Sequence, residues 1–273
     1  MAGQKHSALA RYREGGHAWW ETAISDIAPG RIVLRGHRVE DLISHTSYAG
    51  IVALLVGNLS LSAVQERLLE AALVAGVDHG VRAPSIAAAR MAATCGIPLN
   101  SAVATGINML GNDHGGAGEQ CMEMLYEIAD AKDTQGASTR AVQERLGRGG
   151  NVPGFGHQLH KKRDPRRAPL LRLIEEAQAA REVSGRYKDA ALAVEAALSA
   201  AKGRELTMNV DGATAMIYCE LGFPALAGKG LFCLSRGVGI VAHAVEEMQS
   251  GSLIKGPCPP GPELERYVGR SPD

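Results

Sequence analysis

The stretch SAVQERLLEAALVAG, residues 62 to 76, indicates the fold class through its spacing. Ser62 and Gln65 stand three positions apart and match a capping box, in which each side chain bonds a backbone N–H of the other residue. Apolar side chains then recur at spacings of four, three and four residues, at Val64, Leu68, Ala71 and Ala75. Because this spacing places them on one face of an α-helix, we predict a helix that buries this face.

The same periodicity recurs along most of the chain. We predict helices near residues 46 to 57, 62 to 76, 84 to 95, 101 to 111, 117 to 131, 138 to 147, 168 to 183, 187 to 202, 208 to 221 and 228 to 249. Strand-like alternation appears once, in ISDIAPGRIVLRG (24 to 36), where Pro29 and Gly30 suit a type II turn. We therefore predict a mostly α protein with a small N-terminal β-hairpin.

Composition excludes several classes of protein. Among the 273 residues, Lys plus Arg and Asp plus Glu both number 29, so the net charge of zero argues against a nucleic-acid binder. The five cysteines are odd in number and form no C-x-x-C pair, which favours a reducing cytoplasm over a disulfide framework or a zinc site. The first residues lack the apolar segment of a signal peptide, and no apolar run is long enough for a bilayer. We expect a soluble, cytoplasmic protein without membrane contact.

Four histidines stand beside glycines or charges: His79, His114, His157 and His243. A structural role is the more common one for a single histidine. His157 lies in NVPGFGHQLHKKRDPRR (151 to 167), and His160 follows it at H-x-x-H spacing, but no further ligand motif accompanies the pair, so we predict no metal site. NDHGG lacks the G-K-[ST] end of a P-loop.

Arginines and one aspartate suggest chemistry on a small anion. An arginine fork can bind a carboxylate through two hydrogen bonds, so Arg166 and Arg236 together with the exposed histidines suit a dicarboxylate. Asp211 stands at a predicted helix start, where it is either an N-cap or a general base. Spacing alone leaves both roles open.

Four segments resemble the signature segments of the citrate synthase superfamily in the same order. They are NDHGGAGE (112 to 119), VPGFGHQLHKKRDPR (152 to 166), MNVDGATA (208 to 215) and LSRGVGIVAHAVEE (234 to 247), and the resemblance runs from about Trp20 to Lys255. Within the superfamily the chain is most similar to the citryl-CoA lyase branch, which includes the C-terminal module of ATP-citrate lyase, in IVLRGHRVEDLI (32 to 43), VDHGVRAPS (77 to 85) and NVDG (209 to 212).

The resemblance implies a helical homodimer with two domains. Residues 1–114 and 216–273 would form a large domain, residues 115–215 a small one, and the active site would lie in the cleft between them. The implied reaction is cleavage of citryl-CoA to acetyl-CoA and oxaloacetate, with a coenzyme A thioester as substrate and no resident metal or redox cofactor. A short citrate or 2-methylcitrate synthase and a non-catalytic subunit that binds acyl-CoA are the alternatives.

Residue roles follow from the resemblance position by position. His114 would hydrogen-bond the thioester oxygen, Asp211 would exchange a proton with the methyl carbon, and His157 would hydrogen-bond the keto oxygen of oxaloacetate. The substrate carboxylates would bind residues His79, Arg166 and Arg236. Coenzyme A would bind along the loop at Val152, Gly154, Phe155 and Lys161, with Lys162 and Arg163 as further candidates. Citrate synthases add an arginine from the neighbouring subunit, and here Lys255 is the nearest cation to that position.

Overall fold

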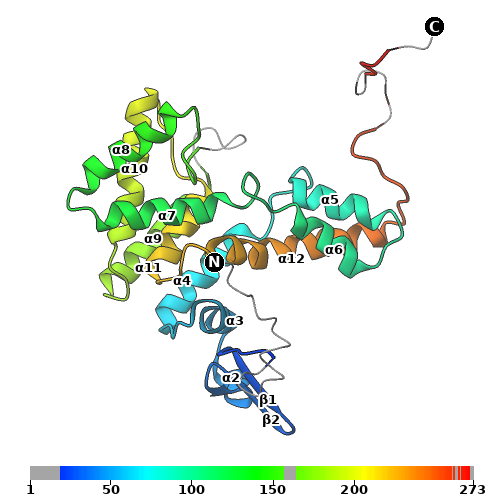
Figure 1. The fold of residues 1–273 in the computed structure, drawn as a ribbon, viewed down its shortest axis with the longest axis horizontal. Helices are drawn as coiled ribbons and strands as arrows, with labels where there is room; N and C mark the ends of the chain where they lie inside the picture. Colours follow the sequence, from blue (N-terminus) through cyan, green and yellow to red (C-terminus); the bar gives the residue numbers. More distant parts are fainter. Residues whose placement is uncertain (1–18, 157–163, 260, 262–263, 265, 271–273) are drawn as a thin grey trace, which may run out of the picture. The chain divides into compact units, whose positions relative to one another are not determined.

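The computed structural model describes residues 19–156, 164–259, 261, 264 and 266–270. The chain divides into two compact units, one ending at Ser60 and the other beginning at Leu61. Most of the described chain is helical (Figure 1), as the periodicity predicted.

The first unit contains a small antiparallel sheet followed by short helices. Strands β1 (Ser25–Ala28), β2 (Arg31–Leu34) and β3 (His37–Arg38) pair in that order. Gly30 has a φ of +72°, the positive value that the predicted turn requires. The third strand adds to the predicted hairpin, and helix α2 (Val39–His45), which follows it directly, was not predicted.

The predicted helix over residues 46 to 57 is shorter and changes form. Helix α3 (Tyr48–Val52) continues into a π-helical turn, η1 (Ala53–Gly57). Asn58 then has a left-handed backbone with a φ of +53°, and its N–H bonds the carbonyl of Ala53. This residue ends the helical segment, because asparagine tolerates that conformation better than most side chains.

The second unit is helical throughout. Its helices are α4 (Ala63–Gly76), α5 (Pro84–Ala93), α6 (Leu99–Asn108), α7 (Ala117–Asp130), α8 (Thr134–Gly147), α9 (Arg167–Ala179), α10 (Arg186–Lys202), α11 (Val210–Glu220) and α12 (Ala227–Gln249). The capping box predicted at Ser62 and Gln65 is present at the start of α4. Helix α8 begins four residues before its predicted start, because Asp133 accepts a hydrogen bond from Gly136 N and caps it.

Small residues let three helices of the second unit approach closely. Helices α5, α6 and α12 pack together around Ile86, Ala89 and Ile240, all fully buried (Figure 1). At Gly106 of α6 an added Cβ would lie 2.8 Å from the Ser85 carbonyl oxygen. This contact confirms that the glycine- and alanine-rich composition serves close helix packing.

Among the remaining helices of the second unit, α11 is the most enclosed. Nine of its eleven residues, from Val210 to Cys219, are buried, and α4, α7, α9 and α10 pack around it. Helix α11 therefore forms the centre of this part of the second unit.

Candidate active site

His114 lies in the loop between α6 and α7 and contacts the start of α5. Its Nε2 accepts a hydrogen bond from the backbone N–H of Ser85 at 3.2 Å and lies 3.0 Å from the Ser85 hydroxyl. Because a backbone amide can only donate, Nε2 carries no proton, and the neutral ring has its proton on Nδ1. Burial, with a smaller effect of the Arg236 charge, lowers the pKa of His114 and favours this neutral form. His114 is therefore a hydrogen-bond donor through Nδ1.

Asp211 occupies the first turn of α11 but is not its cap. Asn209 is the N-cap, since its Oδ1 accepts hydrogen bonds from the N–H groups of Asp211 at 2.9 Å and Gly212 at 3.2 Å. The carboxylate of Asp211 accepts no hydrogen bond from any residue that the structure describes. Burial raises the pKa of Asp211, although the charges of Arg166 and Arg236 act in the opposite direction. The cap role that sequence left open belongs to Asn209, which leaves Asp211 available for proton transfer.

Arg166 is held rigidly by a buried carboxylate. Its Nε and Nη2 donate to Asp164 at 2.9 and 2.7 Å, and Nη1 donates to the carbonyl of Ala75 at 3.2 Å. Asp164 is buried, with its side chain 1% exposed. A guanidinium has five N–H donors, so these three bonds leave two for a ligand. The sequence did not indicate that Asp164 is this partner.

Arg236 extends from α12 to the same helix end. Its Nε donates to the carbonyl of Gly76 at 2.9 Å, one residue beyond the Arg166 contact, and its guanidinium carbon lies 4.9 Å from the ring centre of Phe232. It forms no ion pair within the described residues, and burial lowers its pKa. The last carbonyls of α4, the negative end of its dipole, therefore hold two arginines side by side.

These contacts bring four of the predicted residues together. Arg236 influences the pKa of both His114 and Asp211, and Arg166 influences that of Asp211, which requires all four side chains to lie within electrostatic reach. The cluster combines a neutral hydrogen-bond donor, a carboxyl group with a raised pKa and two fixed cations. Such a set suits an anionic substrate that develops charge on an oxygen while a proton moves at carbon.

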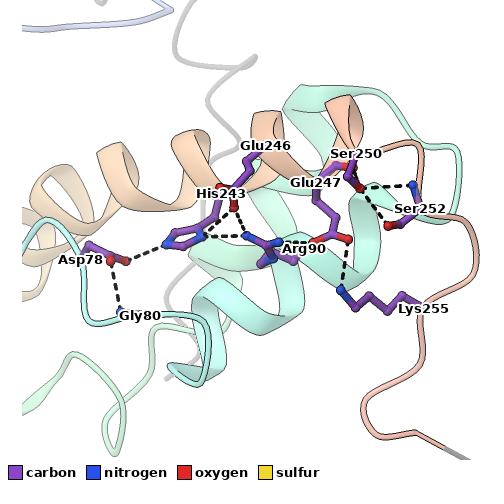
Figure 2. A network of polar contacts seen from close by, with 9 residues as sticks. All are labelled: Asp78, Gly80, Arg90, His243, Glu246, Glu247, Ser250, Ser252 and Lys255. Atoms are coloured by element: carbon purple, nitrogen blue, oxygen red, sulfur yellow. Dashed lines mark hydrogen bonds and ion pairs between the residues drawn. The ribbon is translucent and has the colours of Figure 1, made fainter.

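His79 follows α4 in a loop that a polar network holds in place (Figure 2). The Asp78 carboxylate accepts a hydrogen bond from Gly80 N at 3.1 Å and lies 3.2 Å from His243 Nε2. Burial would raise the pKa of Asp78, but these contacts lower it overall. The network was not predicted, although His243 had been noted as a histidine with an open role.

The same network reaches the segment after α12 (Figure 2). Arg90 binds the carboxylates of Glu246 and Glu247, and Lys255 Nζ lies 3.3 Å from Glu247. Lys255, the cation nearest to the position of the additional arginine of citrate synthases, is thus paired with a carboxylate of its own chain.

The predicted coenzyme A loop is described only up to Gly156. Gly154, with a φ of +83°, packs against Gly212, and its carbonyl accepts a hydrogen bond from Asn209 N at 2.9 Å. The N–H of Phe155 bonds the Val152 carbonyl at 3.2 Å. These two backbone groups already have partners inside the protein. His157, Lys161, Lys162 and Arg163 lie outside the described residues.

Comparison with known proteins accounts for this arrangement. Residues 51–256 match the family described as citrate synthase, C-terminal domain. The chain belongs to the citrate synthase family. The predicted superfamily is therefore confirmed, as is the mostly helical fold.

Individual relatives of the citrate synthase family carry different names. The citrate synthase of Haloferax volcanii is 34% identical over 185 residues, which are 67% of this chain and 47% of that protein. The 2-methylcitrate synthase of Shewanella oneidensis is 29% identical over 212 residues, 77% of this chain and 52% of that protein. The chain thus spans about half the length of these curated relatives.

A solved structure matches over nearly the whole of both chains. The citryl-CoA lyase from Hydrogenobacter thermophilus is 34% identical, superposes with a TM-score of 0.82, and the match covers 93% of this chain and 96% of that one.

No helix in the described ranges is both long and apolar enough to cross a membrane. No group of three or more His, Cys, Asp or Glu side chains in the same ranges is placed to hold a metal ion.

Proposed function

We propose that the protein is an enzyme that cleaves citryl-CoA, or a close analogue, to acetyl-CoA and oxaloacetate, and that it runs the condensation in reverse. The observation that carries the proposal is the joint placement of His114, Asp211 and the two arginines Arg166 and Arg236. The match to a citryl-CoA lyase over nearly its full length supports the choice of reaction.

The chemistry assigned to these side chains agrees with their protonation. When the C–C bond breaks, its electron pair moves into the thioester, whose oxygen becomes negative, and His114 Nδ1–H donates a hydrogen bond to that oxygen. One such donor contributes on the order of a hundredfold to a thousandfold in rate. Asp211 then gives its proton to the new carbon, a role that its raised pKa favours.

The remaining predicted residues complete the proposal. His157 would accept the hydroxyl proton of citryl-CoA, while His79, Arg166 and Arg236 would bind its carboxylates. Lys161 and the loop around Gly154 would bind coenzyme A. No resident metal or redox cofactor takes part in these steps, because the thioester itself accepts the electron pair.

A 2-methylcitrate synthase is the second candidate. The relative of that name from Shewanella oneidensis supports it. A synthase would release free coenzyme A, whereas a lyase running in reverse would form citryl-CoA. Hydrolysis of the thioester therefore separates the two functions.

The deciding experiment uses a panel of 2-oxo acids with acetyl-CoA and propionyl-CoA, with products identified by mass and free thiol measured in parallel. Chemically made citryl-CoA is the substrate for the reverse assay. Asp211→Asn and His114→Ala should lower the rate by at least about a hundredfold, whereas Asp113→Asn, the same change at an exposed position, should not. A fully active Asp211→Asn variant would exclude the mechanism, and a folded wild type without turnover would favour a non-catalytic acyl-CoA-binding subunit.

We also propose a homodimer in the cytoplasm. Helix α12 exposes Leu234, Val238 and Val241 (40%, 62% and 41%) along one uncharged face, which a second copy of the chain would cover. All five cysteines, each in the described part of the chain, are free thiols, in keeping with a reducing compartment. The division into a large domain (1–114 and 216–273) and a small domain (115–215) around the site stays a prediction. Light scattering of the purified protein tests the dimer.

A further inference from the structure

Helix α12 contacts the three successive residues that precede His79 in the chain, Gly76, Val77 and Asp78. The three contacting residues of α12 stand at spacings of three and four, so they share one face of the helix. The contacts are Arg236 on Gly76, Gly239 on Val77 and His243 on Asp78. Two of them concern backbone carbonyls, and only the third joins two side chains.

The contact at Gly239 leaves no room for the loop to shift. A Cβ added there would lie 2.2 Å from the carbonyl oxygen of Val77 and 3.2 Å from Asp78 Oδ1. The loop therefore lies directly on the helix backbone, and the side chain of Asp78 is directed toward the next turn of α12, where His243 meets it (Figure 2).

Arg90 determines the tautomer of His243. Its Nη1 lies 3.0 Å from His243 Nδ1, and since a guanidinium can only donate, Nδ1 must be the acceptor. The proton of the neutral ring is then on Nε2, from which it is donated to Asp78 Oδ1 at 3.2 Å. The groups that face His243 are thus Asp78 from the loop, Arg90 from α5 and Glu246 from α12 itself.

Helix α5 connects this contact to the catalytic cluster. Ser85, in its first turn, binds His114, and Arg90, in its last turn, binds His243. The charge of Asp78 also raises the pKa of Arg236, against the larger effect of burial. Helix α5 therefore links His114, the proposed donor of a hydrogen bond to the thioester oxygen, with the loop that carries His79. Through Asp78, the same loop is linked to Arg236.

We propose that His243 is a positioning residue: with its proton on Nε2, it holds Asp78 and thereby fixes the loop that carries His79. The consequence for substrate binding rests on the proposed function, in which His79 contacts a substrate carboxylate. The consequence for the loop itself does not, so the two can be tested separately.

Two neutral substitutions separate the two hydrogen bonds of the imidazole, the one donated to Asp78 and the one accepted from Arg90. In His243→Gln the amide nitrogen reaches the place of Nε2 and still donates to Asp78. In His243→Asn the shorter amide can accept from Arg90 but cannot reach Asp78. Glu246→Gln is the matched control, because it removes the charge of one of the two carboxylates bound to Arg90, the one whose side chain is 68% exposed, and leaves the contact between His243 and Asp78 in place.

Steady-state kinetics of the condensation provide the first measurement. In His243→Asn we expect the KM for oxaloacetate to rise about tenfold, the effect of misplacing one charge-assisted hydrogen bond, while the KM for acetyl-CoA keeps its wild-type value. His243→Gln should restore most of the loss, and Glu246→Gln should behave as wild type. Equal KM values for oxaloacetate in the Asn and Gln variants, or a parallel rise of both KM values, would overturn the proposal.

Amide hydrogen exchange provides a second measurement that needs no activity. The N–H of Gly80 donates a hydrogen bond to the Asp78 carboxylate. Its exchange rate should be higher in His243→Asn than in wild type and the same as wild type in Glu246→Gln. If the wild type shows no turnover but Gly80 still exchanges faster in His243→Asn, the positioning role is supported and the proposed function is rejected. If the exchange rate of Gly80 is unchanged in His243→Asn, the positioning role alone is rejected. If His243→Asn does not fold, Asp78→Asn, which keeps the side-chain shape, takes its place.

Discussion

Gly154→Ala tests whether the predicted coenzyme A loop and the start of α11 must be in direct contact. A Cβ at Gly154 would lie 2.8 Å from Gly212 Cα and 2.8 Å from the Sγ of Cys121, which is fully buried. Gly154 also has a φ of +83°. The substitution therefore combines a backbone cost with a steric cost, and neither neighbour can move away freely.

Both costs can be given a size. The left-handed backbone costs an alanine roughly 1–2 kcal/mol, and a methyl group forced into a packed site costs about 1–3 kcal/mol. The smaller conformational freedom of the unfolded chain offsets roughly 0.4–1 kcal/mol of this. We expect a loss of about 3 kcal/mol in the free energy of unfolding.

Gly203→Ala is the matched control for the steric part. Gly203 also has a positive φ, +63°, but no atom lies within 4 Å of its added Cβ. Both variants thus carry the same kind of backbone cost, and their difference of about 2 kcal/mol measures the contact with Gly212. Thermal unfolding should show Gly154→Ala melting roughly 4–8 °C below Gly203→Ala. Equal melting temperatures would refute the claim that the loop is packed against α11.

Three further predictions concern the site. Because the pKa of Asp211 is raised by folding, its contribution to stability is present at acidic pH and is lost as the pH rises through that pKa. Asp211→Asn should therefore be more stable than wild type at pH 7, and urea unfolding should show the difference shrinking below pH 4. Arg166→Ala removes the two guanidinium hydrogen bonds to buried Asp164 and should lower the free energy of unfolding by about 3–5 kcal/mol, with Arg172→Ala, which removes an exposed pair, as the unaffected control. Asn209→Ala removes the cap of α11 and should be about 1 kcal/mol less stable in unfolding titrations than Asn209→Ser, which keeps a capping oxygen; both variants lack the side-chain amide that donates to the Gly156 carbonyl, so equal stability of the two would contradict the assignment.

Local signals in the sequence predicted much of the fold. The capping box at Ser62 and the turn at Gly30 depend on neighbouring residues only, so they could be recognised from the chain itself. Helix α2 was missed because Arg38 provides no side-chain cap and the helix has only seven residues. The π-helical turn was missed because its apolar residues fit the α-helical period as well.

The candidate site was predicted less completely, because its contacts join distant parts of the chain. Arg236 and Gly76 are 160 positions apart, and so no local pattern shows that one binds the other. Motif resemblance still located the four clustered residues. For Asp211 the missing information was local: Asn209, two positions earlier, is a strong N-cap and could have indicated that the aspartate is not the cap.

The two arginines at the end of α4 also bear on how the protein responds to its ligands. Arg236 is buried and forms no ion pair within the described residues; its Nε donates to the Gly76 carbonyl, and its guanidinium lies over the ring of Phe232. In the proposed function, a dicarboxylate substrate supplies a counter-charge to Arg236, so its binding also stabilises the folded protein. Thermal-shift screening of small dianions is therefore a direct way to identify the acid for which this site is built, because the fitting compound raises the melting temperature by mass action.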